Sequence, residues 1–383
     1  MAAPPSWPKG KKIVRERILA LDILRGLFIT IVAVDHFAWT PSLFIQFATE
    51  KSWLFASAAE GFFVISGMLV GYIYGPRLLA KTRPVVTRIW KRALLLYFLA
   101  VGFTLFYSLW HLFTPEYDRL GFIPQDLPTL LVNTFTLQYS YGWVDFLNRY
   151  AIFMLFAPIV LWFVAKGYWY IPVIASFALW LSQQFYPFFP NFTAWQILFV
   201  GGVVMGYYLP HFEQAVRGIP QKLRRNIFRY LIGAAIISYV GVVIWMFAIQ
   251  LAHIIAPPDL LWIFHGIHAV YLRLDDFLER GNLGILRLLV GVFWFVSLFL
   301  FVRRYEKTIE KFTRGLLTLL GKNSLFVYCL QAFIIYLVDS IISPPEQSNI
   351  LLNTILGVIF VTILVAATYY KEKVSTYRKR PQL

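Results

Sequence analysis

The stretch LALDILRGLFITIVAVDHFAW, residues 19–39, decides the fold, because it is apolar enough to cross a bilayer and yet contains ionisable residues. Arg25 and His36 are eleven positions apart, and eleven steps of roughly 100° bring a helix back to within about 20° of its starting direction. Both side chains are therefore expected on one helix face, about 16 Å apart along the axis. Ionisable groups at membrane depth cost roughly 2.5–3.5 kcal/mol each, so this stripe predicts a functional site.

The composition extends this expectation to the whole chain. Of its 383 residues, 59% are hydrophobic, 19% are aromatic and only 14% are charged. A soluble domain of this size could not bury so much apolar surface, so we predict an all-α, polytopic integral membrane helical bundle. The single cysteine, Cys329, excludes an internal disulfide framework, and no cleavable signal peptide is expected before the first span.

Ten membrane spans are predicted, because ten apolar segments each have about the 17–25 residues that a helix needs to cross the hydrocarbon. They cover residues 18–40, 53–75, 93–112, 145–165, 168–186, 192–210, 227–250, 282–302, 315–340 and 351–370. Residues 125–140 are too short and too polar for a span, so an interfacial or re-entrant helix is expected there. Residues 18–370 are predicted to form one transmembrane domain, with an outer loop over 251–281 and basic tails over 1–17 and 371–383.

The positions of Lys and Arg predict the orientation. Basic residues gather before the first span, after the second, sixth and eighth spans, and after the tenth. These segments all lie on one side, which the positive-inside rule makes cytoplasmic, together with both termini. The net charge of +16 is thereby explained by topology, so no nucleic-acid partner is expected. We expect a multi-pass protein of the bacterial cytoplasmic (inner) membrane.

The predicted topology places Glu60 at a depth similar to that of His36. The second span runs inward, so Glu60 lies about 10 Å below the outer surface, and consecutive helices are usually neighbours. A histidine held by a carboxylate is a common arrangement for a general base. We therefore predict that His36 removes a proton from a hydroxyl while Glu60 orients the ring. Asp35 points about 100° away on the helix and is the second candidate for the orienting role.

Other residues are predicted to bind substrate. Arg25 is expected to bind an anionic or polarised group that arrives from the cytoplasm. Ser66 belongs to a stretch of small residues, with Gly67 and Gly71, that lets another helix or a thin ligand approach closely. The remaining candidates are polar residues at helix ends or in the basic loop after the second span, namely Asp145, Arg149, Asn323, Ser324, Arg88 and Arg92.

A structural alternative exists for each of these assignments. In that interpretation Arg25 pairs with Asp22 and extends toward the inner surface, His36 is an interfacial histidine, and Glu60 bonds a neighbouring helix. His265 and His268 have the i, i+3 spacing of a metal pair, but no third ligand is evident, so no metal site is predicted.

Several segments resemble the acyltransferase family 3 membrane proteins. The first span has arginine, ten residues and histidine, and EGFFVISGMLVGYIYG (60–75) is similar to that family's FFVxSG segment. Details resemble the OpgC branch in particular. They are LDILRG with VDHF in the first span, DFLNRYAIFMLFAPIVL (145–161), AWQILFVGG (194–202), GNLGILRLL (281–289) and GKNSLFVYC (321–329).

The resemblance implies a membrane O-acyltransferase that takes an acyl group, succinyl or another short acyl, from cytoplasmic acyl-CoA. The group would be placed on a hydroxyl of an extracytoplasmic glycan or glycolipid, and for the OpgC branch the implied acceptors are periplasmic glucans. Arg25 and His36 are the implied functional pair, with Glu60 in support. The expected partners are the lipid bilayer, acyl-CoA and the glycan, and no tightly bound cofactor is expected.

The main alternative is a transporter or exporter of a glycan or lipid-linked substrate without chemistry, in which Arg25 and Glu60 line the path. The lack of a convincing internal repeat weakens that alternative. A third interpretation is a membrane scaffold in a cell-envelope complex. Acyl transfer from labelled acyl-CoA to an added oligosaccharide, as opposed to uptake without modification, distinguishes the first two.

Overall fold

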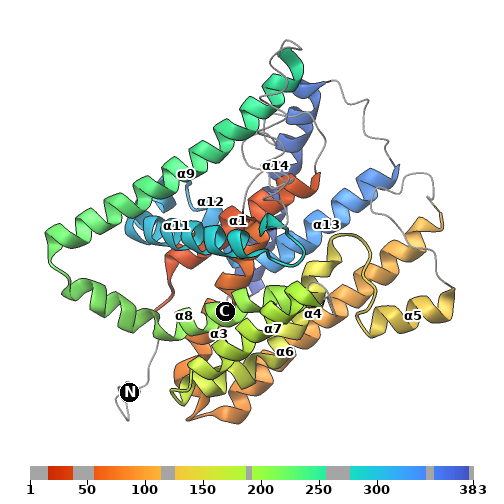
Figure 1. Ribbon diagram of the computed structural model, residues 1–383. Coiled ribbons are helices and arrows are strands. Elements are labelled where there is room, and N and C mark those ends of the chain that lie inside the picture. Colours follow the sequence, from red (N-terminus) through yellow and green to blue (C-terminus); the bar gives the residue numbers. More distant parts are fainter. Residues whose placement is uncertain are drawn as a thin grey trace.

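The computed structural model describes residues 16–37, 56–113, 126–186, 192–255, 277–341 and 349–378, and this part of the chain is helical and without strands (Figure 1). It contains α1 (Leu19–Phe37), α3 (Ala58–Leu78), α4 (Thr82–His111), α5 (Leu127–Phe135), α6 (Asp145–Ala165), α7 (Tyr170–Phe185), α8 (Phe192–Gly218), α9 (Gln221–Ile255), α11 (Ile285–Phe312), α12 (Leu316–Lys322), α13 (Ser324–Ile341) and α14 (Ile350–Arg378). A 3-10 turn, η2 (Gly142–Val144), directly precedes α6. The predicted all-α class is confirmed for these residues.

Seven of the described helices are long and apolar enough to cross a membrane, namely α3, α4, α6, α8, α9, α11 and α14, and up to eight if α12 and α13 count as one span. Helix α1 has 19 residues but contains Asp22, Arg25 and Asp35, and α7 has only 16 residues. Each predicted span overlaps a described helix, or in the case of 315–340 the pair α12 and α13, whereas the predicted number of ten is not confirmed.

The predicted span 315–340 differs most from expectation, because it is broken at Asn323 into α12 and α13 with a bend of 86°. The Asn323 side-chain amide donates to the carbonyl oxygen of Leu319 at 3.1 Å. Asparagine favours breaks of this kind, because its side chain competes for backbone hydrogen bonds. The break turns one expected helix into two short ones and places Ser324 at the start of α13.

The other connections agree with the sequence in part. The predicted short helix within 125–140 is present as the nine-residue α5. The predicted outer loop 251–281 is described only at its two ends, and His265 and His268 lie outside the described residues. The predicted tail that begins at residue 371 starts as a helix, because α14 continues to Arg378.

Glycines bring α3 and α8 into backbone contact. A Cβ at Gly67 of α3 would lie 2.1 Å from the carbonyl oxygen of Phe199, and a Cβ at Gly206 of α8 would lie 2.0 Å from that of Met68. The small-residue stretch around Ser66 therefore accommodates a helix. Ser66, next to Gly67, is buried, and its role in substrate binding stays a prediction.

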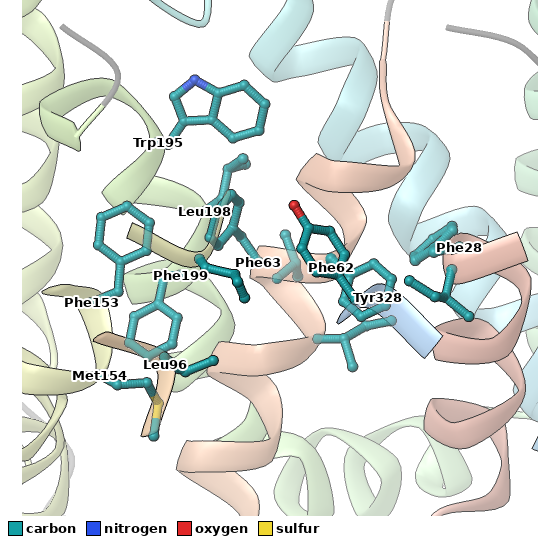
Figure 2. Close-up of a cluster of buried hydrophobic side chains, with 14 of the residues drawn as sticks. Phe28, Phe62, Phe63, Leu96, Phe153, Met154, Trp195, Leu198, Phe199 and Tyr328 are labelled. Atoms are coloured by element: carbon teal, nitrogen blue, oxygen red, sulfur yellow. The ribbon is translucent and has the colours of Figure 1, made fainter. Parts of the chain in front are cut away.

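Aromatic side chains fill the region between α3, α6 and α8. The ring of Phe63 lies 5.6 Å from that of Trp195 and 5.2 Å from that of Phe153, measured between centroids. Figure 2 shows this cluster, which Tyr328 enters from α13. Such packing fixes the positions of α3, α6 and α8 relative to the helix that carries the site, α1.

The N-terminal half of α1 packs against α12 as closely as α3 packs against α8. A Cβ at Gly26 would lie 1.9 Å from the carbonyl oxygen of Leu317, and a Cβ at Gly321 would lie 1.8 Å from that of Asp22. Small residues permit this approach between helices in a membrane, where close van der Waals packing drives association.

Contacts between helix ends group them as the topology predicts. On the predicted cytoplasmic side, Arg303 of α11 pairs with Glu213 of α8 at 2.9 Å, and Glu306 accepts from the backbone N–H of Ala20 at 3.1 Å. On the opposite side, the indole N–H of Trp180 donates to the carbonyl oxygen of Leu283 at 2.9 Å. Which of the two sides is cytoplasmic stays a prediction from the basic residues.

Candidate functional site

His36 lies in the last turn of α1, and its ring points into the helical bundle. The ring stacks on Trp143 of η2, with centroids 5.2 Å apart and planes inclined by 27°. The edge of Tyr328 approaches it at 6.5 Å. The Nδ1 atom lies 3.0 Å from Nε2 of Gln331. Contacts with two aromatic rings and at one ring nitrogen therefore restrict the orientation of the imidazole.

A cavity of about 450 Å³ opens beside the His36 ring. Its wall combines aromatic, acidic and basic side chains from six regions of the chain, and the lining residues are Val32, Asp35, His36, Ala59, Phe62, Trp143, Asp145, Phe146, Arg149, Trp195, Arg280, Gly281 and Tyr328. Apolar walls with a few polar groups are typical of small-molecule sites. The cavity therefore has the size and lining of a substrate pocket.

Asp145 and Arg149 form the predicted pair at the start of α6 and line this cavity. An oxygen of Asp145 lies 2.6 Å from Arg149 Nη2, and the other accepts from the backbone N–H of Phe146 at 2.7 Å. The Arg149 guanidinium also lies over the Trp195 ring, 5.0 Å from its centroid. The Arg149 side chain is 12% exposed and that of Asp145 is 49% exposed, so the pair lies at the edge of the bundle interior.

Glu60 does not hold His36 as the sequence led us to expect. Its carboxylate oxygen Oε1 accepts from Nε of Arg287 at 2.6 Å, and both side chains are only 6% exposed. A buried carboxylate is stabilised far more by a full positive charge than by a neutral imidazole. The predicted His36–Glu60 pair is therefore replaced by a Glu60–Arg287 ion pair between α3 and α11, and Gln331 occupies the Nδ1 side of His36.

Arg25 and Ser324 are brought together, because the Arg25 guanidinium donates to the Ser324 hydroxyl at the start of α13. The structural alternative, in which Arg25 pairs with Asp22, is not what is found. Asp22 accepts from Arg17, with Arg17 Nη2 at 3.0 Å, and this hydrogen bond raises the pKa of the Arg17 guanidinium. Arg25 is not among the residues that line the cavity beside His36.

The other predicted binding residues do not lie together at one site. Asn323 faces α14, where it accepts from Lys371 Nζ at 2.8 Å and donates to Glu372 at 3.3 Å. Arg92 is partly buried and lies within electrostatic range of Arg25, whereas Arg88 is exposed. The Asn323 side chain therefore links the break between α12 and α13 to α14, and the Arg88 side chain is exposed at the surface of the bundle.

Sequence reasoning missed Gln331, Trp143, Arg280 and Arg287. The signal for Gln331 was present, because Ser324, Tyr328 and Gln331 are spaced by four and then three positions and share one face of an otherwise apolar helix. For Arg287 the signal was an arginine inside the predicted span 282–302, where a charge needs a partner. No local pattern marks Trp143 or Arg280, which reach the site through the tertiary fold.

No curated protein and no solved structure matches the chain. The profile of the family described as OpgC protein matches residues 17–376. The wider acyltransferase family 3 remains a resemblance of motifs. Because the match covers nearly the whole chain and includes α1, α13 and every residue of the cavity, this protein belongs to the OpgC family.

Proposed function

We propose that this protein is a membrane O-acyltransferase that moves an acyl group from cytoplasmic acyl-CoA to a hydroxyl of an extracytoplasmic glycan or glycolipid. Membership of the OpgC family points to acyl transfer in glucan modification. The observation that carries the proposal is the imidazole of His36, held by aromatic rings and an amide at the wall of a cavity of about 450 Å³.

The proposed reaction uses His36 as the general base. The acceptor hydroxyl lies in the cavity and transfers its proton to Nε2 of His36 while its oxygen attacks the thioester carbonyl carbon. The carbon–sulfur bond then breaks, and the departing thiolate takes the proton back from the imidazolium. An ester and free CoA thiol are formed, and His36 returns to its neutral state.

Donor binding is assigned to the inner end of α1. A guanidinium offers five N–H donors, and among the described residues Arg25 uses one on the Ser324 hydroxyl. The remaining donors suit a polarised carbonyl or an anionic group of the donor. The partly buried Arg92 and the exposed Arg88 are proposed to attract the CoA phosphates from the cytoplasmic side.

The path between the two ends follows the contact of α1 with α13. Ser324 touches Arg25, and both Tyr328 and Gln331 touch His36. One face of α13 thus runs from the guanidinium to the imidazole. We propose that the thin arm of the donor is guided along this face until its thioester reaches the cavity, in a bacterial inner membrane with the Arg25 end toward the cytoplasm.

The deciding experiment is acyl transfer in liposomes that contain the purified protein, with labelled acyl-CoA on one side and an oligosaccharide acceptor on the other. His36→Ala is expected to lower the rate by roughly 10²- to 10⁴-fold without unfolding the protein, because general-base help has that size. His211→Ala, in α8 and outside the cavity wall, is the matched histidine control and should be close to wild type.

Two results would overturn the proposal. The first is full acylation by a well-folded His36→Ala variant. The second is movement of the oligosaccharide across the membrane without any acyl label on it, which would indicate transport. Mass spectrometry of envelope glycans from cells with and without the gene then identifies the acceptor.

A further inference from the structure

Gln331 is a fully buried amide that contacts the ring of the proposed base, His36. It lies in α13, 295 positions from His36 in the sequence, and none of its surface is exposed. Its Nε2 atom is 3.0 Å from Nδ1 of the imidazole. A buried amide in a membrane helix is costly unless it is hydrogen-bonded, so this contact calls for a role.

The partner of Nδ1 decides which tautomer of a neutral imidazole is present. If Nδ1 carries the proton and donates, then Nε2 keeps the lone pair that a general base needs. The nitrogen and oxygen of an amide exchange places on a rotation of 180° with almost no change of shape. The Gln331 oxygen Oε1 is buried and makes no hydrogen bond in the described part of the chain. Rotation of the amide brings this unused acceptor onto Nδ1–H.

Two carboxylates near the site, those of Glu60 and Asp145, are engaged elsewhere, and a third, Asp35, lines the cavity beside His36. Glu60 is bound by Arg287 at 2.6 Å. The oxygens of Asp145 are used by Arg149 and by a backbone N–H. The amide of Gln331 lies at the Nδ1 side of the ring at 3.0 Å, while Trp143 covers one face.

We infer that Gln331 is a positioning residue, whose amide oxygen accepts a hydrogen bond from Nδ1–H of His36 and so leaves Nε2 unprotonated at the cavity. This inference rests on the proposed function, since it concerns the base of the acyl-transfer reaction. It assigns to a neutral amide the orienting role that a carboxylate plays in other histidine bases. A neutral partner avoids placing a further unpaired charge inside the bundle.

The test compares three variants in the liposome assay, with kcat and KM measured for both substrates. Gln331→Met keeps the volume and removes the acceptor, so kcat is expected to fall roughly 10- to 100-fold, the usual range for partners that orient a functional histidine. Both KM values should stay within a factor of about three, because Gln331 does not line the cavity. Gln331→Glu keeps an acceptor oxygen at the same place and is expected to retain most of kcat.

Leu330→Met is the matched control, because it introduces the same side chain at the neighbouring position of α13 and should leave kcat unchanged. Wild-type kcat in a folded Gln331→Met variant would overturn the inference. If Gln331→Met does not fold, Gln331→Glu decides: a preserved kcat supports the role, and a kcat as low as that of His36→Ala refutes it. Activity of His36→Ala itself would refute the proposed function, which is a separate outcome.

Discussion

The two ends of helix α1 carry the two functional candidates, but they differ in how closely other helices approach. At the outer end, His36 borders a cavity of about 450 Å³. At the inner end, beside Arg25, a Cβ on Gly26 would lie 1.9 Å from the carbonyl oxygen of Leu317. One helix therefore combines an open pocket with a contact between backbones.

The difference indicates a division of tasks along α1. The half of α1 that contains Gly26 is held by α12, so the axis of the helix is fixed there by backbone contact. The outer half borders empty space, and its imidazole is oriented by side chains rather than by backbone contact. A reactive group on a rigid element is held more accurately than one on a loop. The packing around Gly26 thus serves the geometry at His36.

The largest expected effect concerns the outer end and the Glu60–Arg287 pair. Glu60→Leu alone or Arg287→Leu alone should lower the free energy of unfolding by about 3–5 kcal/mol, because each leaves an uncompensated buried charge. The double variant should recover most of this loss, since two apolar residues replace the pair. Thermal and denaturant unfolding in detergent measure the three variants.

A different outcome would change the assignment of Glu60. If Glu60→Leu is as stable as wild type but loses kcat, the carboxylate acts on His36 during the reaction and leaves Arg287 to do so. In that case His36 and Glu60 would form the general-base pair that the sequence predicts.

The next effect concerns the inner end. Arg25→Gln should lower kcat/KM for the acyl donor roughly 10- to 100-fold, which corresponds to the loss of a hydrogen bond from a charged group. KM for the acceptor should not change, because Arg25 does not line the cavity. Arg17→Gln, whose side chain is 60% exposed, is the matched control. An increase in acceptor KM alone would show that Arg25 does not bind the donor.

Close packing at the inner end predicts a smaller effect on stability. Gly26→Ala should cost about 1–3 kcal/mol, because α1 and α12 must move apart to admit a methyl group. Gly102→Ala in α4 introduces the same group where nothing lies within 4 Å, and it should be neutral or slightly stabilising. Equal melting temperatures of the two variants would show that α12 does not hold α1 in this way.

The smallest effect is expected from the exposed pair at the rim of the cavity. Asp145→Asn should change the free energy of unfolding by less than about 0.5 kcal/mol, because the Asp145 side chain is 49% exposed and water screens the pair. If the pair binds the acceptor, KM for the acceptor rises while stability is unchanged. An unchanged KM would indicate that the pair is structural.

Much of the fold followed from hydropathy, for a physical reason. The bilayer demands runs of about 20 apolar residues, and such runs are visible in the sequence without knowledge of tertiary contacts. The short helix α5 was expected for a different reason, because residues 125–140 are too short and too polar for a span. The break at Asn323 was not, because apolar residues continue on both sides of it and its cause is a side-chain hydrogen bond to Leu319.

The site was predictable only where it lies on one helix or on neighbouring turns. Asp145 and Arg149 are four residues apart, and this spacing predicts that their side chains pair. Arg25 and His36 are eleven residues apart, and this spacing predicts that both side chains lie on one face of α1. The partners of these residues come from distant segments. The sequence led to the pairing of Glu60 with His36, because no feature near Glu60 in the chain indicates its actual partner. That partner, Arg287, lies 2.6 Å from Glu60 in the structure but 227 positions later in the sequence.

The attachment of Asn323 to α14 has a consequence for the end of the chain. Lys371 and Glu372 both form hydrogen bonds with the Asn323 side chain at the kink between α12 and α13. The next residue, Ser324, accepts a hydrogen bond from Arg25. Helix α14 therefore supports the kink between α12 and α13, close to the guanidinium of Arg25, for which we propose donor binding. A truncation that removes Lys371 and all residues after it takes away no residue of the cavity wall. It is nevertheless expected to loosen the kink at Asn323 and to weaken the use of the thioester donor.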